Sequence, residues 1–160
     1  MTKATKPARP PQSKDPLLEW PLQHTPQHLL RRAQQRALDI FHDAIGRDGP
    51  TAPQYGVMLA VYQNPGMSQS QLIRLQGIDR STLAEMIKRL VKQDLLSRSR
   101  TSADKRADML HVTEAGERML RDNLDACAKA QARIMEVIPP ERRPELMALL
   151  YLLAELDPPG

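Results

Sequence analysis

The most constraining feature of this chain of 160 residues is a pair of short helical segments separated by only three residues. Ser68 and Gln71 have the spacing of a capping box, which predicts a helix over 69–76. Gly77 closes that helix, and Asp79 is placed to cap a second one of about 14 residues. Two helices joined by a three-residue turn with glycine form the helix-turn-helix pattern, although other folds also pack two helices around a tight turn.

The second helix has an apolar face and a polar face. At about 100° per residue, Leu83, Ile87 and Leu90 fall together and predict the side that packs in the core. The opposite side is short and polar at its start and cationic toward its end, which suits a helix in the major groove of DNA. Glu85 on that side either accepts from a cytosine amino group or forms an ion pair with Arg89.

Basic residues concentrate in this part of the chain. Between Arg74 and Arg106 there are nine Lys or Arg residues and four Asp or Glu residues, while the whole chain has a net charge of +4. A basic centre between nearly neutral segments is expected of a site for a polyanion such as DNA. The alternative is a charged face that simply lies in solvent.

A short hairpin is predicted directly after the second helix. The segments 95–100 (LLSRSR) and 108–112 (DMLHV) alternate in hydrophobicity, which is typical of strands. Behind a helix-turn-helix, such a hairpin forms the wing of a winged helix. At its tip we expect Arg106 to enter the minor groove, Lys105 to reach a phosphate, and Asp104 to hydrogen-bond within the turn and orient Arg106.

Further helices are predicted on both sides of this region. Thr25 and Pro26 start one that Gly46 ends, and the capping-box spacing from Thr51 starts a short one. After Thr113 a single helix is predicted to run to about residue 138, before the helix-breaking segment PPERRP. The last helix contains more leucine than a small winged helix needs for its own core, which predicts an interface with a second copy.

Several classes of protein are disfavoured by what the sequence lacks. It has no apolar run of about 20 residues and no signal peptide, so we expect a cytoplasmic protein without a membrane partner. Cys127 lies among alanines and is expected to be a packing residue, with a disulfide across a two-fold axis as the alternative. Nucleophile–base pairs, phosphate loops and spaced carboxylate pairs are not recognisable, so no enzyme is expected.

Two segments, RSTLAEMIKRLVKQDLLSR and DKRADMLHVTEAG, resemble the recognition helix, first wing strand and wing motif of the MarR family of transcription regulators. The resemblance extends from about Leu29 to Leu156. It implies an obligate homodimer with interleaved terminal helices, whose two winged helices bind an inverted-repeat operator about one DNA turn apart, roughly 34 Å. Asp94 stands where the family usually has glycine, and Asp tolerates the left-handed conformation better than most residues.

The expected fold is therefore mainly α with a small β-hairpin wing: a winged helix-turn-helix with an interleaved helical dimerisation region. Its parts are a flexible proline-rich tail (1–24), a dimerisation helix (25–50), the winged helix-turn-helix (51–112) and C-terminal dimerisation helices (113–157). The residues expected to contact DNA are Ser68, Gln69, Arg80, Ser81, Thr82, Glu85, Lys88, Arg89, Lys92, Lys105 and Arg106.

The family resemblance also implies a ligand. Its members commonly bind a small aromatic acid where the dimer helices meet the DNA-binding lobe, and this weakens operator binding. His28, Arg31, Tyr55 and Met58 offer a cation, hydrogen-bonding groups and an apolar wall for an aromatic carboxylate. The alternative for Arg31 is a surface ion pair, and for Tyr55 and Met58 a position in the core.

The segment TPQHLLRRAQQRALDIFHDAIG resembles members that control the breakdown of nicotinate-type acids. The predicted function is a sequence-specific repressor of transcription, without a cofactor, that such a ligand releases. One alternative is an architectural protein that coats DNA without a ligand, although Ser81, Thr82 and Glu85 favour sequence readout. Another is a metal-responsive regulator using His24 and His28, but His24 precedes the helix and no third ligand is nearby, so no metal site is predicted.

Overall fold

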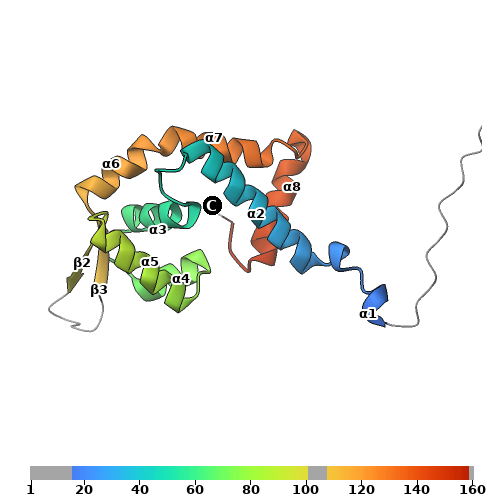
Figure 1. The fold of residues 1–160 in the computed structure, drawn as a ribbon, viewed down its shortest axis with the longest axis horizontal. Helices are drawn as coiled ribbons and strands as arrows, with labels where there is room; N and C mark the ends of the chain where they lie inside the picture. Colours follow the sequence, from blue (N-terminus) through green and yellow to red (C-terminus); the bar gives the residue numbers. More distant parts are fainter. Residues whose placement is uncertain (1–15, 101–107, 159–160) are drawn as a thin grey trace, which may run out of the picture. The chain divides into compact units, whose positions relative to one another are not determined.

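The structure is a computed structural model that describes residues 16–100 and 108–158. In chain order the elements are α1 (Pro16–Glu19), the 3-10 helix η1 (Leu22–His24), α2 (Pro26–Ile45), α3 (Ala52–Gln63), β1 (Met67–Ser68), α4 (Gln69–Gln76), α5 (Arg80–Lys92), β2 (Leu96–Arg100), β3 (Asp108–Val112), α6 (Glu114–Asp122), α7 (Leu124–Met135), the 3-10 helix η2 (Pro140–Arg142) and α8 (Arg143–Leu153) (Figure 1). The part of the predicted tail that is described, residues 16–24, thus contains two short helical segments.

The chain divides after Arg36 into two units, 1–36 and 37–160, which are described separately. The boundary falls within α2. At the start of that helix the Thr25 hydroxyl accepts a hydrogen bond from the amide of His28, and at its end Gly46 has a φ of 86°. The predicted start and end of this helix are therefore confirmed.

The core lies in the second unit, where α3, α4 and α5 pack with the sheet. Leu83, Ile87 and Leu90 of α5 are at most 1% exposed, which confirms the predicted core face of this helix. Among the larger side chains of the described residues, Val57, Met58, Val61, Leu72, Leu96 and Leu110 also have almost no exposed area. These residues hold the two helices of the helix-turn-helix and the wing strands on one apolar centre.

The helix-turn-helix has the capping contacts that its sequence predicts. The Ser68 hydroxyl accepts from the Gln71 amide (3.3 Å), while Gln71 Oε1 accepts from the amide of Ser68 (2.8 Å). Gly77 ends α4 with a φ of 62°. Asp94 follows α5 with a φ of 57°, so this aspartate adopts the left-handed conformation that usually favours glycine.

The sheet has three antiparallel strands in the order β1-β3-β2. The predicted hairpin of β2 and β3 is confirmed, with Leu96 opposite Val112. Sequence analysis missed β1, in which Met67 pairs with Leu110. A strand of two residues is too short to show alternation, so only its tertiary partner identifies it.

The single helix predicted from Thr113 to about residue 138 is wrong, because Asn123 interrupts it between α6 and α7. The main-chain amide and the side-chain Nδ2 of Asn123 both donate to the carbonyl of Met119 (3.2 and 2.9 Å). Asparagine competes in this way for main-chain partners and is a poor helix former. Figure 1 shows that α7 continues α6 with a change of direction.

The leucine-rich α8 leaves most of its apolar side chains uncovered within one chain. Leu149 is 55% exposed, Leu152 is 76% exposed and Leu153 is 61% exposed. This agrees with the excess of leucine noted in the sequence. No helix in the described ranges is both long and apolar enough to cross a membrane.

Candidate nucleic-acid interface

Helix α5 presents its polar side chains to solvent because its apolar side chains are buried in the core. The exposed residues are Arg80, Ser81, Thr82, Glu85, Lys88, Arg89 and Lys92. They form a stripe that has, after Arg80, the hydroxyl side chains of Ser81 and Thr82 near its start and the cations Lys88, Arg89 and Lys92 toward its end, as the sequence predicted. We call these residues the α5 stripe.

Asp79 organises the start of this stripe. Its Oδ1 accepts from the Ser81 hydroxyl (2.6 Å) and from the Thr82 amide (2.9 Å). These hydrogen bonds, that of Ser81 foremost, hold the pKa of the Asp79 carboxyl well below its usual range. Because the Ser81 hydroxyl proton is directed to Asp79, its oxygen remains available to accept from a base.

Glu85 forms an ion pair within α5, but its partner is Lys88 and not Arg89. Its Oε1 lies 3.9 Å from Nζ of Lys88, so the expectation of a pair with Arg89 is corrected. The Lys88 and Glu85 side chains are 76% and 62% exposed, respectively. An ion pair so exposed is weak, and both groups remain available to another partner.

The wing and the start of α4 are joined through β3. Ser68, the N-cap of α4, also pairs with Met109 of β3. On the outer face of the sheet, Ser99 Oγ lies 3.0 Å from Nε2 of His111, a contact that sequence analysis missed because it needs the strand register. Asp104, Lys105 and Arg106 lie outside the described residues, and Gln69 is half-buried.

A cleft of about 440 Å³ opens between the start of α3 and the α5 stripe. It is lined by Thr51, Gln54, Ser81, Thr82, Glu85, Met86 and Arg89. Four of these belong to the predicted DNA-contact set. Thr51, Gln54 and Met86 were not predicted as site residues, since the sequence marks the first two only as a capping box, which the structure confirms.

The residues predicted to bind an effector are divided between the two units. Tyr55 and Met58 are both buried in the core of the second unit, at 3% and 0% exposed. The Tyr55 hydroxyl donates to the carbonyl of Leu120 (3.3 Å), and burial raises the pKa of this hydroxyl. In the first unit His28 is half-buried and Arg31 is exposed, whereas Tyr55 and Met58 share the core of the second unit.

Cys127 lies beside Tyr55 and is partly buried. Burial raises the pKa of its thiol, as expected of a packing residue that does not react. Across residues 16–100 and 108–158, no three His, Cys, Asp or Glu side chains gather in a way that could hold a metal ion.

Comparison with known proteins connects these features to a family. Residues 51–107 match the model of the MarR family. The chain is 30% identical over 158 residues to the HTH-type transcriptional repressor NicR of Pseudomonas putida, which covers 98% of this chain and 95% of that protein.

Two solved structures have the same fold. One concerns the regulation of DNA binding of Bordetella bronchiseptica BpsR by 6-hydroxynicotinic acid, with a TM-score of 0.78, 27% identity and coverage of 84% of this chain and 96% of that one. The other is the transcriptional repressor CouR bound to a 23-mer DNA duplex, with a TM-score of 0.74, 27% identity and coverage of 83% and 94%. The chain therefore belongs to the MarR family and is a DNA-binding transcriptional regulator, not an enzyme.

Proposed function

We propose that this protein is a homodimeric repressor that binds an inverted-repeat operator and leaves it when a small aromatic carboxylate binds. The observation that carries the proposal is the α5 stripe, in which seven polar or charged side chains are exposed on a helix whose other face is locked in the core. A helix anchored in this way can enter the major groove without losing its own packing.

Each part of the interface has a proposed role. Ser81, Thr82 and Glu85 contact base edges, where Glu85 accepts from cytosine. The cations Arg80, Lys88, Arg89 and Lys92 contact phosphates, as do Ser68 and Gln69 at the start of α4. At the wing, Arg106 reads the minor groove, Lys105 contacts a phosphate, and Asp104 orients Arg106.

The uncovered leucines of α8 support a homodimer. Five of its apolar side chains, Met147, Leu149, Leu150, Leu152 and Leu153, are between 41% and 76% exposed in a single chain. Several large apolar side chains exposed on one helix are characteristic of an interface. The dimer places two α5 helices on successive major grooves, roughly 34 Å apart.

For the effector, we propose an aromatic carboxylate of the nicotinate type. Support comes from the similarity to BpsR, whose DNA binding 6-hydroxynicotinic acid regulates. Of the four residues predicted for this ligand, we propose that Arg31, with His28 beside it in α2, pairs with the carboxylate, whereas Tyr55 and Met58 pack in the core of the second unit. The cleft beside α5 is a second candidate location, in which Arg89 offers the cation and Met86 the apolar wall.

Selection of bound fragments from random double-stranded DNA, with and without 6-hydroxynicotinic acid, tests this function. We expect an inverted-repeat consensus that the acid depletes. Fragments without a consensus would instead support an architectural protein. Loss of binding on addition of a chelator, restored by a divalent metal, would support the metal-responsive regulator.

A further inference from the structure

The break at Asn123 divides a stretch of helix into two parts, α6 and α7, whose exposed polar side chains contact different neighbours. Asn123 has φ and ψ of −100° and 1°, and α7 starts at the next residue with the Cys127 amide donating to the Asn123 carbonyl (2.9 Å). A kink of this kind needs a cause within the ladder of main-chain hydrogen bonds. The Asn123 side chain, which bonds the Met119 carbonyl, supplies part of it.

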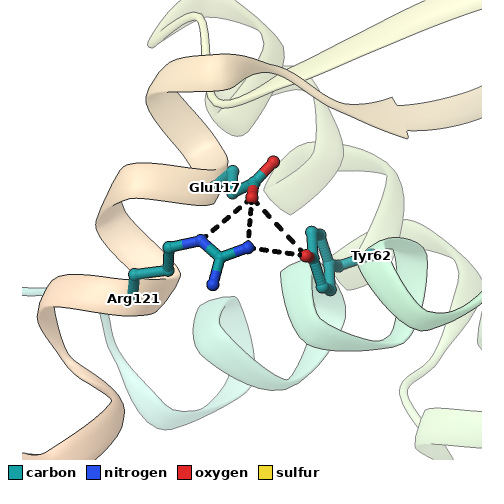
Figure 2. Close-up of polar contacts among 3 residues, drawn as sticks. All are labelled: Tyr62, Glu117 and Arg121. Atoms are coloured by element: carbon teal, nitrogen blue, oxygen red, sulfur yellow. Dashed lines mark hydrogen bonds and ion pairs between the residues drawn. The ribbon is translucent and has the colours of Figure 1, made fainter.

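Helix α3 of the DNA-binding lobe holds α6. As Figure 2 shows, the Tyr62 hydroxyl lies between two side chains of α6, donating to Glu117 Oε1 (3.5 Å) and accepting from Arg121 Nη2 (3.0 Å). Arg121 Nε also donates to Glu117 Oε1 (2.9 Å). All these contacts lie before the break, so they attach α6 alone to the DNA-binding lobe.

Helix α7, by contrast, has an ion pair with the last part of α2. Arg133 Nη1 lies 3.8 Å from Asp43 Oδ2, and Ala130, one turn before Arg133 in α7, is completely buried. The loop after α2 approaches the break itself, since a Cβ added to Gly49 would lie 3.5 Å from Oδ1 of Asn123. The loop after α2 and the start of α7 therefore lie at Asn123, where α6, which α3 of the DNA-binding lobe contacts, ends.

Tyr55 is the side chain that reaches both sides of the break. Its hydroxyl donates to the carbonyl of Leu120 in α6, which a residue at position 124 would bond in an uninterrupted helix. The same side chain interacts with Cys127 in the first turn of α7. Its ring is held from α2 by Phe41, with the centroids 6.0 Å apart and the planes tilted by 58°.

We propose that Asn123 is the hinge on which the DNA-binding lobe turns relative to the dimerisation helices, and that Tyr55 latches this hinge in the DNA-binding arrangement. The inference rests on the proposed function, because an effector that takes the Tyr55 hydroxyl would release the latch. Tyr55 is thus a positioning residue: it does not touch DNA, but it fixes the direction of α6, which leads into the wing through β3.

Hydrogen exchange measured on the full-length dimer tests the latch without DNA or an effector. The variant is Tyr55→Phe, which keeps the ring and removes the hydroxyl. The matched control is Tyr62→Phe, which makes the same change on the same helix but loses contacts only to α6. We expect Tyr55→Phe to accelerate exchange about fivefold in peptides covering 119–130, as loss of one hydrogen bond implies. Tyr62→Phe should leave residues 123–130 unchanged.

A second variant, Asn123→Ala, favours a continuous helix and should slow exchange at residues 123–130. Operator binding is measured in parallel: Tyr55→Phe should weaken it about fivefold, and Tyr62→Phe less than twofold. Equal exchange patterns for the two tyrosine variants, or acceleration spread evenly over the chain, would overturn the hinge. Failure of the wild-type protein to select an operator would instead refute the proposed function, and the exchange result would still stand.

Discussion

At the scale of single residues, the start of α6 lies very close to the turn after α5. The Thr113 hydroxyl caps α6 by accepting from the Gly116 amide (3.1 Å) and also donates to the Asp94 carbonyl. The Thr113 amide donates to the carbonyl of Leu95 (3.2 Å). The start of α6 is thereby fastened to the end of the helix-turn-helix.

Gly116 permits this approach because it has no side chain. A Cβ there would lie 2.2 Å from the Leu95 carbonyl oxygen and 2.8 Å from Cγ1 of Val112. We therefore expect Gly116→Ala to lower the free energy of unfolding by about 2 kcal/mol or more, measured by urea titration. Gly77→Ala is the comparison, since it meets no atom within 4 Å and should lose only about 1 kcal/mol from its positive φ. Equal losses would show that the Gly116 contact is not tight.

Asp79 gives the start of α5 a dependence on pH. Because the folded-state pKa lies below the usual 3.8, the carboxylate contributes stability that is present above that value and is lost as the pH falls. We expect the melting temperature of the wild type to exceed that of Asp79→Asn at pH 7, and the difference to shrink below about pH 4. Thermal unfolding monitored by circular dichroism measures it, and a difference independent of pH would contradict this role.

At the scale of elements, the capping boxes of α3 and α4 and the apolar face of α5 were predictable because they depend on residues within one or two turns. The break at Asn123 was not, because one asparagine in a helical stretch does not by itself end a helix, and the contacts around the break come from Tyr55 and Gly49 in other segments. The two-residue β1 likewise exists only through its pairing with β3. The Glu85 partner was wrongly expected because spacings of three and four residues are both within reach on a helix.

The division of the α5 stripe into base-reading and phosphate-contacting residues can be measured. Changing Lys88 or Lys92 to Ala should lower the slope of log K against log salt by about one each and leave the consensus unchanged. Lys129→Ala, on the exposed surface of α7, is the control and should leave both the slope and the consensus as they are. A shifted consensus in either stripe variant would mean that the lysine reads bases.

At the scale of the whole molecule, the exposed leucines of α8 are expected to be covered by a second copy. Leu152→Asp places a carboxylate on the most exposed of these positions. Because burying an unpaired charge is costly, we expect this variant to be monomeric by light scattering at concentrations where the wild type is dimeric. Its operator affinity should fall sharply, since a monomer contacts only one half-site. Unchanged mass would remove α8 from the proposed interface.

The sequence by itself determined the order of the helices, their caps, the cationic stripe and the hairpin, because each of these depends on the spacing of residues that are close together in the chain. Only the tertiary structure decided that α6 and α7 are separate, that Tyr55 spans their junction, and that α3 and α5 enclose a cleft. These features join segments far apart in the chain, and their geometry depends on how the core packs. Local pattern selects the elements of this regulator, whereas packing selects which of their side chains meet.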